Sequence, residues 1–100
     1  MSYTMLTKTE ILQKLQSLMP ELREKYGVQE MGLFGSFSKD EGTLDSDIDL
    51  LVSFSRPVGW DYCSLSIYLE EVFGRKIDLV TQKAIRSTMK EDILNQVEYV

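Results

Sequence analysis

Residues 47–54 constrain the fold more strongly than any other segment, because their side chains alternate in character like those of a half-buried β-strand. The alternation places Ile48, Leu50, Val52 and Phe54 on one face and Asp47, Asp49, Leu51 and Ser53 on the other. The first face is apolar throughout and belongs in a core, whereas the second begins with two carboxylates. We therefore predict a strand over residues 47–54 that ends at the turn residues 56–59.

A helix and a further strand follow this segment. Residues 61–73 carry apolar side chains at helical spacing, namely Leu65, Tyr68, Leu69 and Val72, and Gly74 is a typical helix end. Residues 76–81 form the next strand, with Ile77 and Leu79 opposite Asp78 and Val80. The connection of about 21 residues is long enough for a right-handed parallel crossover, so the two strands are predicted to be neighbours. Asp78 can then share a face with Asp47 and Asp49, although alternation alone leaves the register open.

Two capping boxes predict the outer helices. Residues 7–10 (Thr-Lys-Thr-Glu) open a helix that Pro20 is expected to kink or restart, and Gly27 is expected to end it. A short strand over 28–34 follows. Residues 88–91 open the last helix, whose predicted core residues are Met89, Ile93, Leu94 and Val97. We predict an α/β (α+β) fold, with a small mixed three-stranded sheet packed by helices and one domain over residues 1–100.

Composition removes several classes of function. The 100 residues include 16 acids, 11 bases, no histidine and one cysteine, with a net charge of −5. The lone Cys63 cannot form an internal disulfide and is expected to be at least half-buried, and a histidine-based triad or a Cys/His zinc site is excluded. The acidic balance argues against a nucleic-acid-binding face. No apolar segment approaches the 18 to 20 or so residues of a membrane span and no signal peptide is evident, so we expect a cytoplasmic protein.

The pair Asp47 and Asp49 is a candidate cation site. Two carboxylates at positions i and i+2 of a strand point the same way and repel each other unless a proton or a divalent cation lies between them. A calcium-binding EF-hand loop is the nearest alternative, but its glycine and glutamate positions hold Leu50 and Arg56. Asp45 is interpreted as a turn cap and not as a ligand.

Gly35 and Ser36 are a candidate phosphate-binding turn. They end one predicted strand and open a short helical turn, where a glycine allows close approach to the backbone and a serine adds a hydroxyl donor. Neither a Walker sequence nor Gly-x-Gly-x-x-Gly is present. By itself the dipeptide is also typical of a plain turn.

The combined pattern is more specific. Gly35-Ser36, ten further residues, Asp47-x-Asp49 and a later strand aspartate, Asp78, resemble the signature of the DNA-polymerase-β-like nucleotidyltransferase superfamily. Residues 33–37 (Leu-Phe-Gly-Ser-Phe) and 46–52 (Ser-Asp-Ile-Asp-Leu-Leu-Val) are similar to those of the minimal nucleotidyltransferases (MNT), which are encoded beside HEPN-domain ribonucleases. The resemblance covers nearly the whole chain and implies a polymerase-β-like nucleotidyltransferase core.

The resemblance also implies an activity. Gly35 and Ser36 would hold a nucleoside triphosphate, and Asp47, Asp49 and Asp78 would bind Mg²⁺, two ions in all, and perform catalysis. Lys39 occupies the position where family members often have an arginine, and would offer charge to phosphate without a bidentate fork. The implied reaction transfers AMP from ATP to a tyrosine of a HEPN toxin, which makes the chain an antitoxin. Two alternatives stay open: an antitoxin that acts by binding alone, and the catalytic subunit of a small-molecule nucleotidyltransferase.

Overall fold

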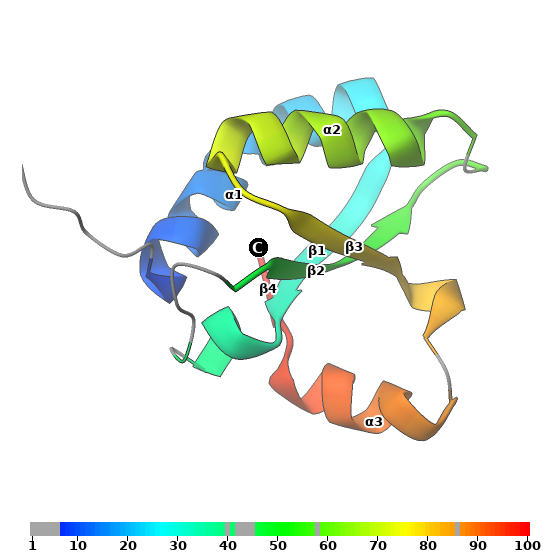
Figure 1. Cartoon of the computed structure of the whole chain (residues 1–100). Coiled ribbons are helices and arrows are strands. Elements are labelled where there is room, and N and C mark those ends of the chain that lie inside the picture. Colours follow the sequence, from blue (N-terminus) through cyan, green and yellow to red (C-terminus); the bar gives the residue numbers. More distant parts are fainter. Residues whose placement is uncertain (1–6, 40, 42–45, 58, 86) are drawn as a thin grey trace, which may run out of the picture.

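The computed structural model describes residues 7–39, 41, 46–57, 59–85 and 87–100, which form helices on both sides of a mixed sheet (Figure 1). The elements are, in chain order, α1 (Lys8–Tyr26), β1 (Val28–Phe34), the 3₁₀ helix η1 (Ser36–Lys39), β2 (Ile48–Phe54), α2 (Asp61–Phe73), β3 (Ile77–Thr81), the 3₁₀ helix η2 (Gln82–Ala84), α3 (Ser87–Gln96) and β4 (Glu98–Tyr99). The strands lie in the order β3-β2-β1-β4. β2 runs antiparallel to β1, and it runs parallel to β3, as a crossover through α2 requires. The predicted α+β fold with a mixed sheet is confirmed.

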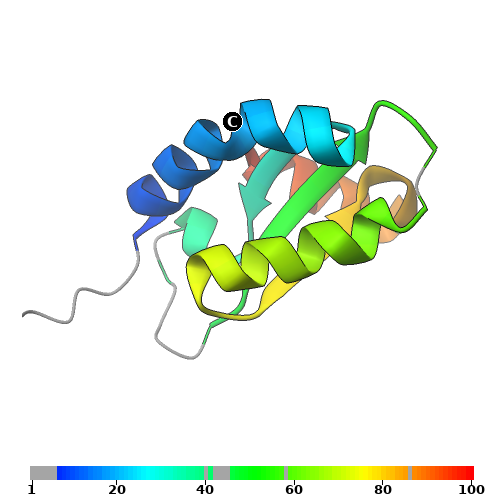
Figure 2. The same cartoon turned by 90° about the horizontal axis from the view of Figure 1, so that it is seen from above.

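The core lies between the sheet and the pair α1 and α2. These two helices lie side by side over one face, and α3 lies on the other side of the sheet (Figures 1 and 2). The fully buried core side chains that share that first face come from alternating strand positions, namely Met31, Leu33, Ile48, Leu50 and Val52. The predicted division of the 47–54 segment is therefore confirmed, and the side chains of Asp49 and Leu51 point to the α3 side.

The first helix begins and ends where the sequence predicts. Thr7 and Glu10 form a reciprocal capping box, and Gly27 follows the last residue in a left-handed conformation. The expectation that Pro20 restarts the helix is wrong, because α1 continues through it. Pro20 is on the exposed side of α1 while Met19 and Leu22 are buried, so packing of the apolar stripe against the sheet compensates for the hydrogen bond that proline cannot donate.

The carboxyl-terminal region departs most from the prediction. α3 begins at Ser87, one residue before the predicted cap, and the side chains of residues 87–90, including Met89, lie outside the described part. Leu94 is 40% exposed and not a core residue, because Ile93 beside it takes the buried position. A two-residue strand, β4, extends the three predicted strands to four by pairing with Gly32 and Leu33. A Cβ atom at Gly32 would run into Val97, so the missing side chain makes room for this segment.

Two remaining expectations concern the surface. Cys63 is exposed on α2, so the prediction that it is at least half-buried is wrong; Leu65 and Leu69 occupy the buried side of that helix. Asp45, interpreted as a turn cap, lies outside the described residues. No helix within the described ranges combines the length and the apolar character needed to cross a membrane.

Candidate active site

The register of β2 and β3 brings two of the predicted carboxylates together. Asp49 is the direct partner of Asp78 in the parallel ladder, and Ile48 pairs with Ile77. Both aspartates point to the α3 side of the sheet, since the residues before and after them belong to the core. The alternation had left this register open, and the structure assigns it.

The electrostatics of Asp49 reflect this arrangement. Burial is the largest of the causes that raise its pKa to about 6; the charge of Asp78, a hydrogen bond with Asp78 and the charge of Asp47 add to it. The hydrogen bond favours the protonated form because a neutral carboxyl can donate to the neighbouring carboxylate. A half-buried aspartate that holds its proton this strongly is typical of a functional site.

Gly35 places the candidate phosphate-binding turn against the same carboxylate. Phe34 pairs with Asp49 across β1 and β2, so Gly35 lies at the edge of the aspartate cluster. The φ angle of Gly35 is +77°, and a Cβ atom there would stand 2.9 Å from Cγ of Asp49 and nearer still to its Oδ2. Residue 35 is therefore restricted to glycine for two reasons: its backbone conformation and its distance from the Asp49 carboxylate.

The turn after Gly35 has its own hydrogen bonds. The backbone N–H of Ser38 and its hydroxyl both donate to the Gly35 carbonyl, at 3.1 and 2.8 Å, and the N–H of Glu41 donates to the Ser36 carbonyl at 2.8 Å. Ser38 is buried, whereas Ser36 is exposed and can meet a ligand. Lys39 is the last residue of η1, and its side chain is exposed.

Asp47 completes the candidate set from the position just before β2, where it is half-buried. Its charge contributes to the raised pKa of Asp49. Within the described ranges, no three acidic, cysteine or histidine side chains are gathered into a group that could hold a metal ion. The donor chemistry of the Asp49 and Asp78 pair nevertheless fits a divalent cation, because hard carboxylate oxygens that repel each other are stabilised when a cation lies between them.

Arg75 is a basic residue near the site that the sequence interpretation did not select. It lies between α2 and β3, and its Nη1 donates to the carbonyl of Ser46, the residue before Asp47, at 3.1 Å. Its guanidinium carbon lies 5.1 Å from the centre of the Phe37 ring in η1. A basic residue placed directly before the aspartate-bearing strand was the signal available in the sequence.

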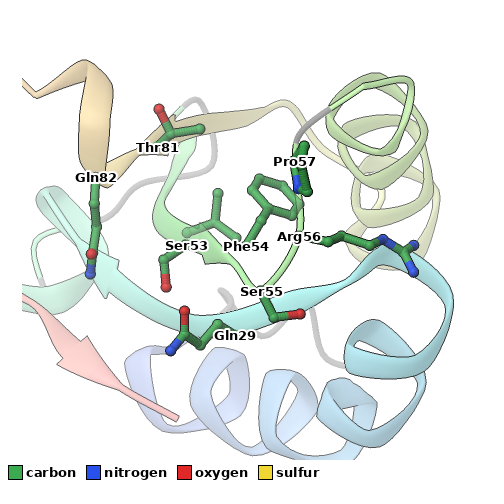
Figure 3. A pocket seen from close by; sticks show the side chains of 9 residues that line it. Gln29, Ser53, Phe54, Ser55, Arg56, Pro57, Thr81 and Gln82 are labelled. Carbon is green, nitrogen blue, oxygen red and sulfur yellow. The ribbon is translucent and has the colours of Figure 1, made fainter.

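A cavity of about 820 Å³ lies at the opposite end of the strands. Gln29, Ser53, Phe54, Thr81 and Gln82 line it, and Arg56, also in its lining, extends away from the others (Figure 3). Ser53 is four residues beyond Asp49 on β2, or roughly 13 Å along a strand. The guanidinium of Arg56 donates to Asp61 and to the Lys25 carbonyl, so its charge is already paired. The candidate active site and this cavity are therefore separate regions.

Comparisons with known proteins identify the family of this chain. Residues 15–100 match the model of the nucleotidyltransferase domain family. The protein adenylyltransferase MntA of Thermococcus cleftensis is 40% identical over 97 residues, which cover 96% of this chain and 98% of the relative.

Solved structures share the fold. One protein assigned as a minimal nucleotidyltransferase superposes with a TM-score of 0.80 at 24% identity, covering 96% of this chain and 98% of that one. A toxin–antitoxin structure with AMP-PNP gives 0.69 at 21% identity, covering 84% of this chain and 70% of the other. A complex of a tri-AMPylated HEPN toxin from Shewanella oneidensis with its MNT antitoxin gives 0.62 at 20% identity, with 88% and 70% covered.

The fold, the site and these matches together define the class of protein. A mixed sheet that carries paired aspartates beside a Gly-Ser turn is the framework of a nucleotidyl-transferring enzyme. The chain belongs to the nucleotidyltransferase family, and within it to the group of the MntA-type protein adenylyltransferases.

Proposed function

We propose that this chain transfers AMP from ATP to a tyrosine hydroxyl of a HEPN-domain toxin, with Mg²⁺, and thereby acts as its antitoxin. The observation that carries the proposal is the contact between three sequence motifs: Asp49 pairs with Asp78, and Gly35 lies against Asp49. Further support comes from a relative that is a protein adenylyltransferase and from a similar fold seen in complex with an AMPylated HEPN toxin.

In this proposal each residue has a distinct role. Gly35 and the exposed hydroxyl of Ser36 receive the triphosphate, and Lys39 offers a positive charge to it. Asp47, Asp49 and Asp78 would hold the metal, which when bound neutralises triphosphate charge and polarises the α-phosphoryl group. The raised pKa of Asp49, to about 6, means that this carboxyl is largely ionised and available as a ligand only above that pH.

The transfer itself is a single displacement at phosphorus. The tyrosine oxygen forms a bond to the α-phosphorus, the bond between that phosphorus and the bridging oxygen breaks, and pyrophosphate leaves. The hydroxyl proton goes to the carboxylate of Asp78, which is exposed and so can be reached by an incoming side chain. Alignment of the two oxygens supplies much of the rate, and the partner must provide that alignment for its own tyrosine.

Co-expression with a HEPN-domain partner protein tests the proposal. Mass spectrometry of the purified partner should show additions of AMP mass on a tyrosine, and Asp49→Asn in this chain should remove them. Exposed Asp92→Asn on α3 is the matched control for loss of one negative charge. A partner that stays unmodified, yet is neutralised equally by wild type and Asp49→Asn, would establish an antitoxin that acts by binding alone. Transfer of AMP to a small molecule instead would favour the catalytic subunit of a small-molecule nucleotidyltransferase.

A further inference from the structure

Arg75 connects the two halves of the candidate active site. Its guanidinium lies over the ring of Phe37, two residues after Gly35, with 5.1 Å between the guanidinium carbon and the ring centre. The same group donates a hydrogen bond of 3.1 Å to the carbonyl of Ser46, which precedes Asp47. One side chain therefore contacts both the phosphate-binding turn and the segment that carries the first aspartate.

The surroundings make these contacts specific. Phe37 is only 2% exposed, so its ring is held by the core and provides a fixed surface for the guanidinium. Arg75 is half-buried, which strengthens both the interaction with the ring and the charged hydrogen bond compared with a fully solvated side chain. The backbone adds a second connection, because the N–H of Ile48 donates to the Lys76 carbonyl at 3.1 Å. Ser46 and Ile48, the residues on either side of Asp47, are thus hydrogen-bonded to Arg75 and Lys76 respectively.

We propose that Arg75 is a positioning residue that sets the distance between the Gly35-Ser36 turn and Asp47. This inference rests on the proposed function, since the separation matters only if triphosphate and carboxylates meet in one reaction. Small displacements of reacting groups cost large factors in rate, so loosening either half should reduce transfer. Arginine suits this role because a planar guanidinium can stack on a ring and donate in its own plane at once, whereas the ammonium group of lysine cannot.

Three variants test the role of Arg75. Arg75→Met keeps an unbranched side chain over Phe37 and removes the charged donor. Arg75→Lys keeps the positive charge but lacks the planar guanidinium. Lys76→Met is the matched control, because it removes a neighbouring positive charge from an exposed side chain and leaves the backbone bond to Ile48 in place. Phe37→Leu provides an independent route, since it removes the ring but keeps an apolar side chain in the core.

The first measurement is amide hydrogen exchange without nucleotide or partner. Arg75→Met should speed exchange at Ser38, Glu41 and Ile48 by about 10-fold and leave the amides of α1 unchanged. Arg75→Lys should be intermediate, and Lys76→Met should match wild type. Equal acceleration in α1 would mean that Arg75 only stabilises the whole fold, and no acceleration anywhere would mean that it positions nothing; either result overturns the inference.

The second measurement is AMP transfer well below the melting temperature. We expect Arg75→Met to lower kcat/KM by roughly 10- to 100-fold, with partial recovery in Arg75→Lys. Adding Arg75→Met to Phe37→Leu should then cost less than it does in wild type, because both changes break the same contact. A normal rate in Arg75→Met would overturn the positioning role. If wild type itself transfers no AMP while exchange at Ser38 and Ile48 is locally faster in Arg75→Met, the proposed function fails and the connection through Arg75 stands.

Discussion

The two ends of strands β2 and β3 differ in the groups and the space that a ligand would meet. At the amino end, Asp49 and Asp78 are paired in the ladder and joined by a hydrogen bond, with Gly35 lying against Asp49. At the carboxyl end, there is a cavity of about 820 Å³, but its polar groups are neutral or already paired, as Arg56 is with Asp61. The cavity and the titratable carboxylates therefore lie at opposite ends of the same pair of strands.

This difference shows why cavity size alone does not select the candidate active site in this chain. A large pocket is a reasonable first candidate for a binding site, yet it needs convergent polar groups with perturbed ionisation to perform chemistry. Those groups lie at the amino end. The comparison predicts that substitutions at the two ends have unequal effects.

The largest effect is expected for Asp47→Asn at the amino end. The change removes a proposed metal ligand and should lower the rate of AMP transfer by roughly 1000-fold or more, while the fold stays intact because no core atom is lost. Gln29→Ala, an exposed position in the cavity lining, should transfer at the wild-type rate. Steady-state kinetics with labelled ATP measure both, and equal losses would contradict the division between the two ends.

The next effect separates a clash from backbone strain. Gly35 and Gly74 both have left-handed φ angles, +77° and +65°, so an alanine is strained by a similar amount at either position. Only at residue 35 does the added Cβ meet a carboxylate, whereas nothing lies within 4 Å at residue 74. Gly35→Ala should displace Asp49 and lower transfer by about 100-fold or more. Gly74→Ala should lower the melting temperature slightly and keep the rate; similar rates in both variants would contradict the packing of Gly35 on Asp49.

A smaller effect is expected for Ser36→Ala, which removes one hydroxyl donor to phosphate. A hydrogen bond to a charged group contributes about 1.5 to 3 kcal/mol, so transfer at subsaturating ATP should fall roughly 10- to 150-fold. Ser64→Ala, an exposed serine on α2, is the matched control. If Ser36→Ala reacts as fast as this control, the hydroxyl does not contact the triphosphate.

The smallest effect concerns stability and its dependence on pH. Because burial and the nearby Asp78 raise the pKa of Asp49 to about 6, the folded protein binds more protons than the unfolded chain between about pH 4 and 6. The stabilisation that this carboxyl contributes is therefore complete below pH 4 and is lost as the pH rises through 6. With chelator present at pH 7.5, Asp49→Asn should be more stable than wild type by about 1 kcal/mol, after allowance for solvent screening, or roughly 4 to 8 °C in Tm.

The same pair of proteins should have equal Tm values near pH 4, where the wild-type carboxyl is protonated. A constant difference at both pH values would show that the asparagine acts through packing and not through charge. Adding Mg²⁺ at pH 7.5 should raise the Tm of wild type more than that of Asp49→Asn. Equal increases in Tm would show that Asp49 does not bind the metal.

Much of the fold could be predicted because local patterns and tertiary packing agree. The alternation around Leu50 and the capping box at Thr7 each specify an element through short-range chemistry, and the structure confirms both. The exceptions lie where a local rule competes with packing. Pro20 does not restart α1 because the buried stripe continues on both sides of it, and β4 is too short to show any periodicity.

The candidate site divides in the same way. Residue types, their spacing along the chain and the family resemblance pointed to Gly35, Ser36, Asp47, Asp49 and Asp78, and the structure brings Gly35, Asp49 and Asp78 into proximity. Arg75 was not selected, because its contacts with Phe37 and Ser46 join residues that are distant in the chain. The roles of all these residues stay proposals for the experiments above.

By itself, the sequence determined the order of elements, the apolar face of β2 and the identity of the carboxylates, because each depends on side-chain chemistry within a few residues. Only the tertiary structure decided that Asp49 is opposite Asp78, since a shift of two residues in the ladder would keep every side chain on the same face and alternation cannot distinguish such registers. It likewise decided the raised pKa of Asp49, which depends on burial and on charges from two strands. The candidate active site thus combines locally encoded residues with a register that the pairing of β2 with β3 establishes.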